Sequence, residues 1–130
     1  MNPHHFKSLR RETGLTVRDL ADLLLMNEKT IRVWERASGQ DPHPTAVRVL
    51  EWIRDGLIAL PVPAFERMTA AEFQAGRISL GLSIERLAGI LDVAPPEIIA
   101  AWESDRGPHP AATFVMQLML TGYRPPESLD

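Results

Sequence analysis

Residues 14–36, GLTVRDLADLLLMNEKTIRVWER, contain two short helical patterns separated by a break. Thr16 followed by Asp19 is typical of a capping box, and the leucines that come next are spaced to line one face of a helix. Asn27 predicts the start of another helix, which runs to about Arg36. The stretch therefore predicts two consecutive short helices joined by a tight turn.

Further helical patterns flank this stretch, and no segment has the alternation of a strand. A helix is predicted to end at about Thr13, because Gly14 follows it and glycine commonly ends helices. On the other side, Pro42 and Pro44 introduce a segment with apolar residues at i, i+3, i+4 and i+7, which Gly56 ends. The first half of the chain thus reads as four or five short helices.

The same pattern returns after about 67 positions, with one inserted residue and a later two-residue deletion. The matching positions are Phe6 with Phe73, Arg10 with Arg77, Gly14 with Gly81, Leu20 with Leu87, Ala21 with Ala88, Leu24 with Leu91, Ile31 with Ile99, Trp34 with Trp102, Glu35 with Glu103 and the Pro-His-Pro segment 42–44 with 108–110. The sequence therefore predicts an all-α chain with two tandem modules. We place them at 1–60 and 68–126, with 61–67 as a linker that contains Pro61 and Pro63.

Composition narrows the class of protein. The 130 residues are 45% hydrophobic and 24% charged and include no cysteine, so disulfides and thiolate metal sites are excluded. The apolar runs are far shorter than the roughly 20 residues of a membrane span, and residues 1–11 do not resemble a signal peptide. We expect a cytoplasmic protein with no membrane contact. Its charge is uneven, at +1 for residues 1–60 and −4 for residues 61–130.

Residues 14–36 resemble the Cro and lambda-repressor-like helix-turn-helix family, also called the XRE family. The resemblance is carried by Gly14-Leu15-Thr16, Leu20-Ala21, Met26-Asn27, Ile31 and Trp34-Glu35-Arg36. Residues 81–104, GLSIERLAGILDVAPPEIIAAWES, resemble the same pattern less completely. The resemblance implies two tandem lambda-repressor-like modules, double-stranded DNA as the partner, and regulation of transcription without a cofactor.

The resemblance also implies an ion pair in each module. In that family an Arg of the first helix pairs with the Glu that ends the recognition helix. The corresponding pairs are Arg10 with Glu35 and Arg77 with Glu103. A partly buried pair of this kind forms two charge-assisted hydrogen bonds. Two solvated charges are the alternative.

The first module supplies the predicted DNA contacts. If Ile31 and Trp34 face the core, the opposite face of their helix carries Lys29 and Arg32 as the best candidates for reading bases, because Arg and Lys donate to guanine. The predicted DNA-binding residues are Thr16, Val17, Arg18, Asn27, Glu28, Lys29, Arg32, Val33, Arg36 and His43. Among them, Arg36, His43 and the amides of residues 16–18 would contact phosphates. An ordinary solvated helix face is the alternative.

The second module lacks these cations. Glu97, Ala100, Ala101 and Ser104 stand where the first module has Lys29, Arg32, Val33 and Arg36. Its last helix carries Phe114, Leu118 and Leu120 in place of Arg48, Trp52 and Arg54, so it is apolar on almost every side. We therefore predict that Phe114, Leu118 and Leu120 form an association surface for a homodimer. Packing of this face between the two modules of one chain is the alternative.

Other sites have little support in the sequence. The histidines show no helical i, i+4 pair for a metal, and no phosphate loop, serine elbow or carboxylate pair indicates catalysis. We therefore expect no enzymatic activity, no metal and no cofactor. The favoured function is a repressor that binds a palindromic operator. The alternatives are an antitoxin-type regulator that also binds a partner protein, and a protein-binding adaptor that has lost DNA binding.

Overall fold

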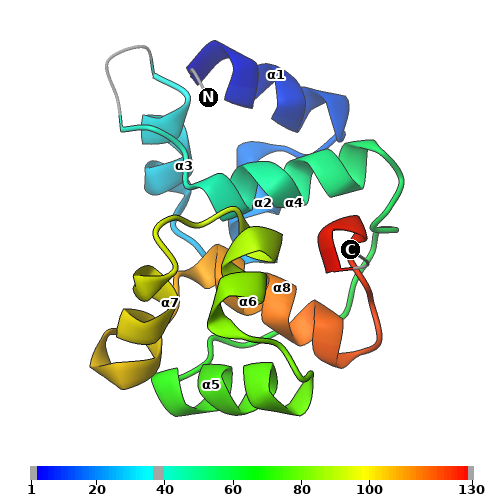
Figure 1. The fold of residues 1–130 in the computed structure, drawn as a ribbon. Coiled ribbons are helices and arrows are strands. Elements are labelled where there is room, and N and C mark those ends of the chain that lie inside the picture. Colours follow the sequence, from blue (N-terminus) through cyan, green and yellow to red (C-terminus); the bar gives the residue numbers. More distant parts are fainter. Residues whose placement is uncertain (1–2, 37–39, 129–130) are drawn as a thin grey trace. The chain divides into compact units, whose positions relative to one another are not determined.

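The computed structural model describes residues 3–36 and 40–128, and every regular element in these ranges is a helix (Figure 1). The chain divides into two compact units, Met1–Ala64 (unit 1) and Phe65–Asp130 (unit 2). The division lies inside the segment 61–67 that the sequence marks as a linker. Within the described ranges, no helix has the length and apolar character that crossing a membrane requires.

The described residues of unit 1 form four helices, two of which are short and consecutive. They are α1 (Pro3–Glu12), α2 (Val17–Leu24), α3 (Glu28–Trp34) and α4 (Pro44–Arg54). α1 packs on α4, and α2 packs on α3. α3 ends at Trp34, two residues before the predicted end, and Glu35 is its C-cap residue.

Side-chain caps fix where the helices of unit 1 begin. The Thr16 hydroxyl accepts from the Asp19 N–H and the Asp19 carboxylate accepts from the Thr16 N–H, both at 3.0 Å, so the predicted capping box is present. α2 ends at Leu24, and the C-cap residue Leu25 adopts the left-handed conformation at φ 58°. Asn27 then caps α3 by accepting from the Lys29 N–H at 2.8 Å. Three residues, 25–27, thus form the turn between α2 and α3.

The core of unit 1 is built from the apolar faces of all four helices. The Phe6 ring meets Trp34 edge-on, with centroids 5.7 Å apart. Ala21 is also buried, and its small side chain suits the crossing of α2 and α3. The fully buried large side chains of this unit are Phe6, Leu9, Leu20, Leu24, Ile31 and Leu50.

Unit 2 repeats this order with additions. Its elements are α5 (Ala70–Ser79), α6 (Ile84–Leu91), α7 (Glu97–Ala101), the π-helical turn η1 (Trp102–Arg106), α8 (Pro110–Leu120) and the 3₁₀ turn η2 (Pro126–Ser128). Thr69 and Glu72 form a second capping box, and Phe73 meets Trp102 edge-on at 6.0 Å. The two units therefore share caps and an aromatic pair as well as their sequence pattern.

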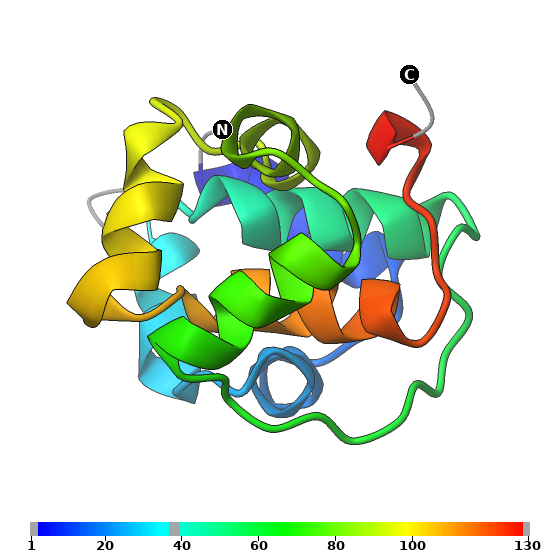
Figure 2. The ribbon, with the colours of Figure 1, turned by 60° about the horizontal axis from the view of Figure 1, so that its bottom comes forward.

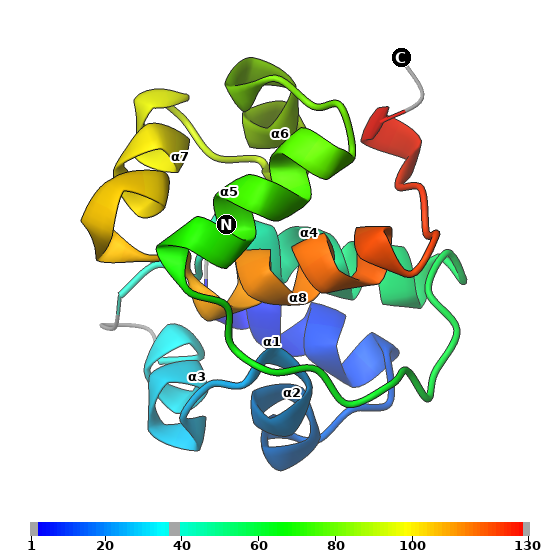
Figure 3. The same cartoon turned by 90° about the horizontal axis from the view of Figure 1, so that it is seen from below.

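Two features distinguish unit 2. α7 begins after Pro96 without a side-chain cap and passes directly into η1, where unit 1 has the single helix α3. α5 crosses closely over α8 (Figures 2 and 3). A Cβ added to Gly76 would lie 2.9 Å from the Met116 sulfur, so glycine permits this crossing.

Candidate nucleic-acid interface

The outward face of α3 is set by the two residues that point inward. Ile31 is fully buried and Trp34 is 3% exposed, so these two residues mark the inward side of α3. Side chains on the opposite side of the helix face away from the core. Lys29 and Arg32 are exposed, as is Arg36 just beyond the end of α3. Glu28 and Val33 are half-buried at the edges of this face. The predicted base-reading residues of α3 are therefore brought together on one surface.

Arg32 and Glu28 form an ion pair on that surface. Arg32 Nη2 lies 3.3 Å from Glu28 Oε1, one helical turn away, and the two side chains are 59% and 45% exposed. Exposed pairs at this spacing contribute only about 0.3–0.5 kcal/mol. The pair orients Arg32 along the helix, yet Arg32 can leave Glu28 for a stronger acceptor at little cost.

The start of α2 offers fewer amides than the sequence suggests. The Thr16 N–H already donates to Asp19, so our assignment of that amide to a phosphate is wrong. The N–H groups of Val17 and Arg18 occupy the first helical positions, which have no acceptor within their own helix. Hydrogen bonds from Thr16 lower the pKa of the Asp19 carboxyl, and this negative charge competes with a phosphate at the same helix end.

A largely buried ion pair supports the end of α3. Arg10 Nε and Nη2 donate to the two carboxylate oxygens of Glu35 at 2.6 and 3.1 Å, and Arg10 Nη1 donates to the Leu15 carbonyl at 2.8 Å. The two side chains are only 10% and 9% exposed. Arg10 thereby connects α1 to the loop before α2 and to the end of α3. These bonds fix the position of α3 relative to α1.

The second predicted pair is present with the same geometry. Arg77 donates to the Glu103 carboxylate at 2.7 and 3.0 Å and to the Leu82 carbonyl at 2.9 Å. Hydrogen bonding to Glu103 raises the pKa of Arg77. The alternative of two solvated charges is therefore wrong in both units.

His43 has a structural role that the sequence did not predict. Its Nδ1 accepts from the Thr45 N–H at 3.2 Å, so the imidazole caps α4. Burial lowers the pKa of His43 to about 4, so the ring is neutral at pH 7 and carries no charge toward a phosphate. His109 caps α8 in the same way, accepting from the Ala111 N–H at 3.1 Å. The repeated Pro-His-Pro segments therefore work as helix starts.

The predicted association surface is wrong for two of its three residues. Phe114 is completely buried and Leu118 is 6% exposed, while Leu120 is 44% exposed. Phe65 of the predicted linker meets Phe114 edge-on at 5.6 Å, and Glu66 exchanges hydrogen bonds with Gln117. The apolar side of α8 is thus covered in part by the chain segment that precedes α5. Leu120 alone of the three stays available to a partner.

The positions of unit 2 that correspond to Lys29, Arg32, Val33 and Arg36 carry no basic side chain. Glu97, Ala100 and Ser104 are exposed and Ala101 is half-buried. Over residues 3–36 and 40–128, no group of three or more His, Asp or Glu side chains is arranged to hold a metal ion.

Comparisons of the chain with models of known protein families, with curated proteins and with solved structures gave no match.

Proposed function

We propose that the chain is a sequence-specific DNA-binding regulator of transcription, in which each unit is a lambda-repressor-like helix-turn-helix module. The observation that carries the proposal is the exposed face of α3, with Lys29 and Arg32, held in place by the buried pair Arg10–Glu35. A two-helix unit with a turn of three or four residues places its second helix in the major groove. The protein then acts by occupying its operator, without catalysis.

Each residue of the face has a chemical role in this proposal. Arg32 and Lys29 donate to guanine O6 and N7, and Glu28 accepts from cytosine N4 once Arg32 has left it. Val33 contacts a thymine methyl. Arg36 contacts the phosphate backbone, together with the amides of Val17 and Arg18.

The buried pair fixes the helix that carries the exposed cations of the proposed reading surface. Base discrimination requires that side chains hold their geometry, which depends on a fixed helix. Arg10 makes three hydrogen bonds that connect the end of α3 to the rest of unit 1. Unit 2 keeps this support in Arg77 and Glu103, but its corresponding surface offers Glu97 and Ala100. We therefore assign DNA reading to unit 1 alone.

One reading unit covers one half-site, so we propose that two chains bind a palindrome. Their α3 helices would enter successive major-groove faces about 34–36 Å apart. The dimer does not use Phe114 or Leu118, because both are buried. Repression is the simplest outcome of such occupancy, since it needs no activating surface.

The test is selection of binding sites from random duplex DNA with the full chain, followed by titration of the enriched duplex and a scrambled one. An enriched inverted repeat supports the proposal, and salt-sensitive binding to all sequences alike contradicts the sequence-specific part. Arg32→Ala and Arg106→Ala form a matched pair, because both remove one exposed arginine. Only Arg32→Ala should weaken binding to the enriched duplex. Absence of binding at about 50 mM salt, where phosphate contacts are strongest, would refute DNA binding altogether.

A further inference from the structure

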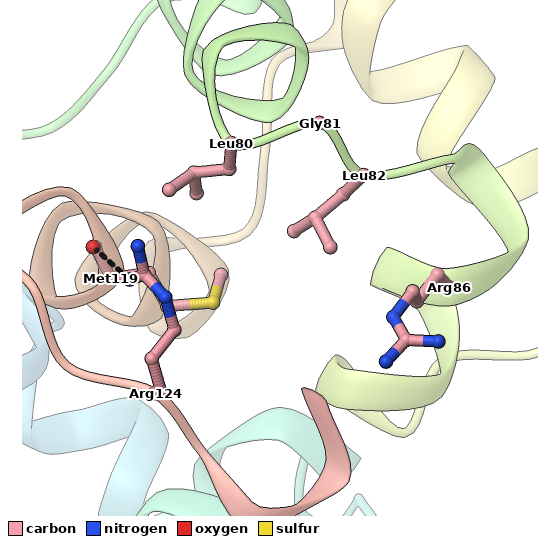
Figure 4. Close-up of a pocket in the computed structure, with 6 residues that line it drawn as sticks. All are labelled: Leu80, Gly81, Leu82, Arg86, Met119 and Arg124. Carbon is pink, nitrogen blue, oxygen red and sulfur yellow. Dashed lines mark hydrogen bonds between the residues drawn. The ribbon is translucent and has the colours of Figure 1, made fainter. Parts of the chain in front are cut away.

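Unit 2 contains a pocket of about 250 Å³ on the side of α6 (Figure 4). The residues that line it are Leu80, Gly81, Leu82, Arg86, Met119 and Arg124. They come from the α5–α6 connection, the first half of α6, the end of α8 and the segment after α8. All six belong to unit 2, so the pocket does not depend on the placement of unit 1.

The lining combines an apolar floor with two cations. Leu80, Leu82 and Met119 supply hydrocarbon and thioether surface, and Figure 4 shows the Arg86 and Arg124 guanidinium groups on opposite sides of the space in that view. No carboxylate is among the lining residues. Binding sites for small organic molecules typically have this composition, with a few polar groups that orient an otherwise apolar contact.

Arg124 is held in position before any ligand arrives. Its Nη1 donates to the carbonyl oxygens of Met119 at 2.9 Å and Tyr123 at 3.0 Å. Both bonds use the same nitrogen, so Nε and Nη2 keep donor capacity on the guanidinium fork. A fork that is already ordered loses little entropy when it binds a carboxylate.

Comparison with unit 1 shows that both arginines are departures from the repeat. Arg86 and Asp19 occupy the same position, because each donates its N–H at 3.0 Å to the hydroxyl that caps its helix, Ser83 or Thr16. Arg124 likewise corresponds to Ile58: the preceding residues, Tyr123 and Leu57, each donate to a carbonyl five residues back.

Those two replacements change the polarity and the charge at the two positions. Ile58 is 4% exposed and belongs to the core of unit 1. Unit 2 has an exposed arginine instead, and Arg86 adds a second positive charge where unit 1 has the acidic Asp19. The frame of the repeat does not require either arginine, since unit 1 folds in the same way without them.

We propose that this pocket binds a small organic carboxylate with a compact apolar body. The carboxylate would lie between Arg86 and Arg124, and the apolar body would lie against Leu80, Leu82 and Met119. Pockets for drug-sized ligands span about 300–1,000 Å³, so this pocket selects a smaller molecule. The positive end of the α6 dipole, next to Leu82 and Arg86, adds to the attraction. This inference is independent of DNA binding.

Methyl and amide NMR titrations of the full chain with benzoate and cyclohexanecarboxylate test the proposal. We expect saturable shifts at the methyl groups of Leu80, Leu82 and Met119. Benzamide lacks the charge, and acetate and inorganic phosphate lack the apolar body, so each should bind at least tenfold more weakly. Equal binding of benzamide, or shifts that map elsewhere, would overturn the proposal. Absence of saturation with both carboxylates in the folded protein would overturn it as well.

Charge-removing variants locate the site. Arg86→Gln and Arg124→Gln should each weaken benzoate binding at least fivefold, while Arg106→Gln, an exposed arginine of η1 outside the pocket, should leave it unchanged. Arg124 also bonds to the end of α8, so the spectrum of Arg124→Gln must first show a folded protein. If that variant is unfolded, the comparison of Arg86→Gln with Arg106→Gln decides. Equal binding by those two variants would refute the role of Arg86.

Discussion

The α3 helix of unit 1 and the α7–η1 segment of unit 2 end on the same ion pair but present opposite surfaces. Glu35 and Glu103 each accept two hydrogen bonds from an arginine of the first helix of their unit, at 2.6–3.1 Å. Outside that pair, unit 1 exposes Lys29 and Arg32, and unit 2 exposes Glu97 and Ala100. The two units therefore share the buried ion pair but differ in the charge of the exposed residues around it. This separation indicates that the ion pair serves folding, and the proposed DNA contact would then depend on the side chains around it.

The largest expected effect is the loss of that shared pair. Glu35→Ala should lower the free energy of unfolding by about 3–5 kcal/mol, because it leaves the Arg10 charge buried and uncompensated. Chemical denaturation followed by circular dichroism measures the change. Glu103→Ala should give a loss of the same size, since Glu103 is only 4% exposed.

The matched control for Glu35→Ala is Glu28→Ala on the same helix. Glu28 also pairs with an arginine, but the side chains of Glu28 and Arg32 are 45% and 59% exposed, so the change should be within about 0.5 kcal/mol. Similar values for the two variants would mean that burial of the Arg10–Glu35 pair has no energetic consequence.

The fourth helices of the two units offer a second comparison. Phe114 of α8 stands where α4 has Arg48, and its ring is completely buried. Phe114→Ala should destabilise the protein by about 3–5 kcal/mol through the cavity it leaves. Arg48→Ala, at a half-buried position, should cost much less. If the Phe114→Ala variant is folded and monomeric and its stability is unchanged, the ring is not part of the core. That result would support the predicted role of Phe114 in association.

Periodicity and capping signals predict the frame well, because they report on local geometry. The capping box at Thr16 and the arginine–glutamate pairs appear where the sequence places them. The apolar surplus of α8 was misread because the pattern shows only that a face is buried. It does not show that Phe65, at the end of a proline-rich segment, contacts Phe114.

Functional details were harder to predict where one group has two uses. Thr16 was assigned to a phosphate although its capping box with Asp19, visible in the sequence, already engages its amide. The sequence does not predict that the two arginines line one pocket, because Arg86 and Arg124 are 38 positions apart and neither matches the repeat. The available signals were that arginines replace Asp19 and Ile58 of the first repeat.

The two arginines at α3 should affect DNA binding differently. Arg32→Ala should cost about 1–3 kcal/mol on the preferred operator and relax the choice at one base pair. Arg36→Ala should weaken all sequences alike and lower the salt slope by about one, since Arg36 lies past the end of α3. Fluorescence anisotropy on operator and scrambled duplexes at several salt concentrations measures both. An equal loss for Arg32→Ala on the two duplexes would refute base reading.

The last expected effect concerns the histidine that caps α4. His43 has a pKa of about 4 in the folded protein against 6.5 when exposed, because burial disfavours the charged ring. Between these values the unfolded chain binds more protons, so the contribution of His43 to stability is complete above about pH 6.5 and is lost as the pH falls toward 4. Protonation also turns Nδ1 into a donor, and it can then no longer accept from the Thr45 N–H. The difference between 6.5 and about 4 sets an upper limit of about 3 kcal/mol on this loss, of which the N-cap itself accounts for about 1 kcal/mol.

Replacement of His43 by serine separates this titration from the others in the protein. Serine also caps helices but does not ionise in this range, so His43→Ser should retain most of the stability at pH 7 and lose less of it by pH 4.5. Melting temperatures measured from pH 7.5 to 4.5 give the difference between the two profiles. His5→Ser, at an exposed position on α1, controls for removal of a histidine and should follow the unaltered protein. Because carboxyl groups titrate in all three proteins, the difference between profiles isolates the imidazole. Coincident profiles for His43→Ser and the unaltered protein would show that the cap survives protonation, and that burial of this ring has no influence on stability.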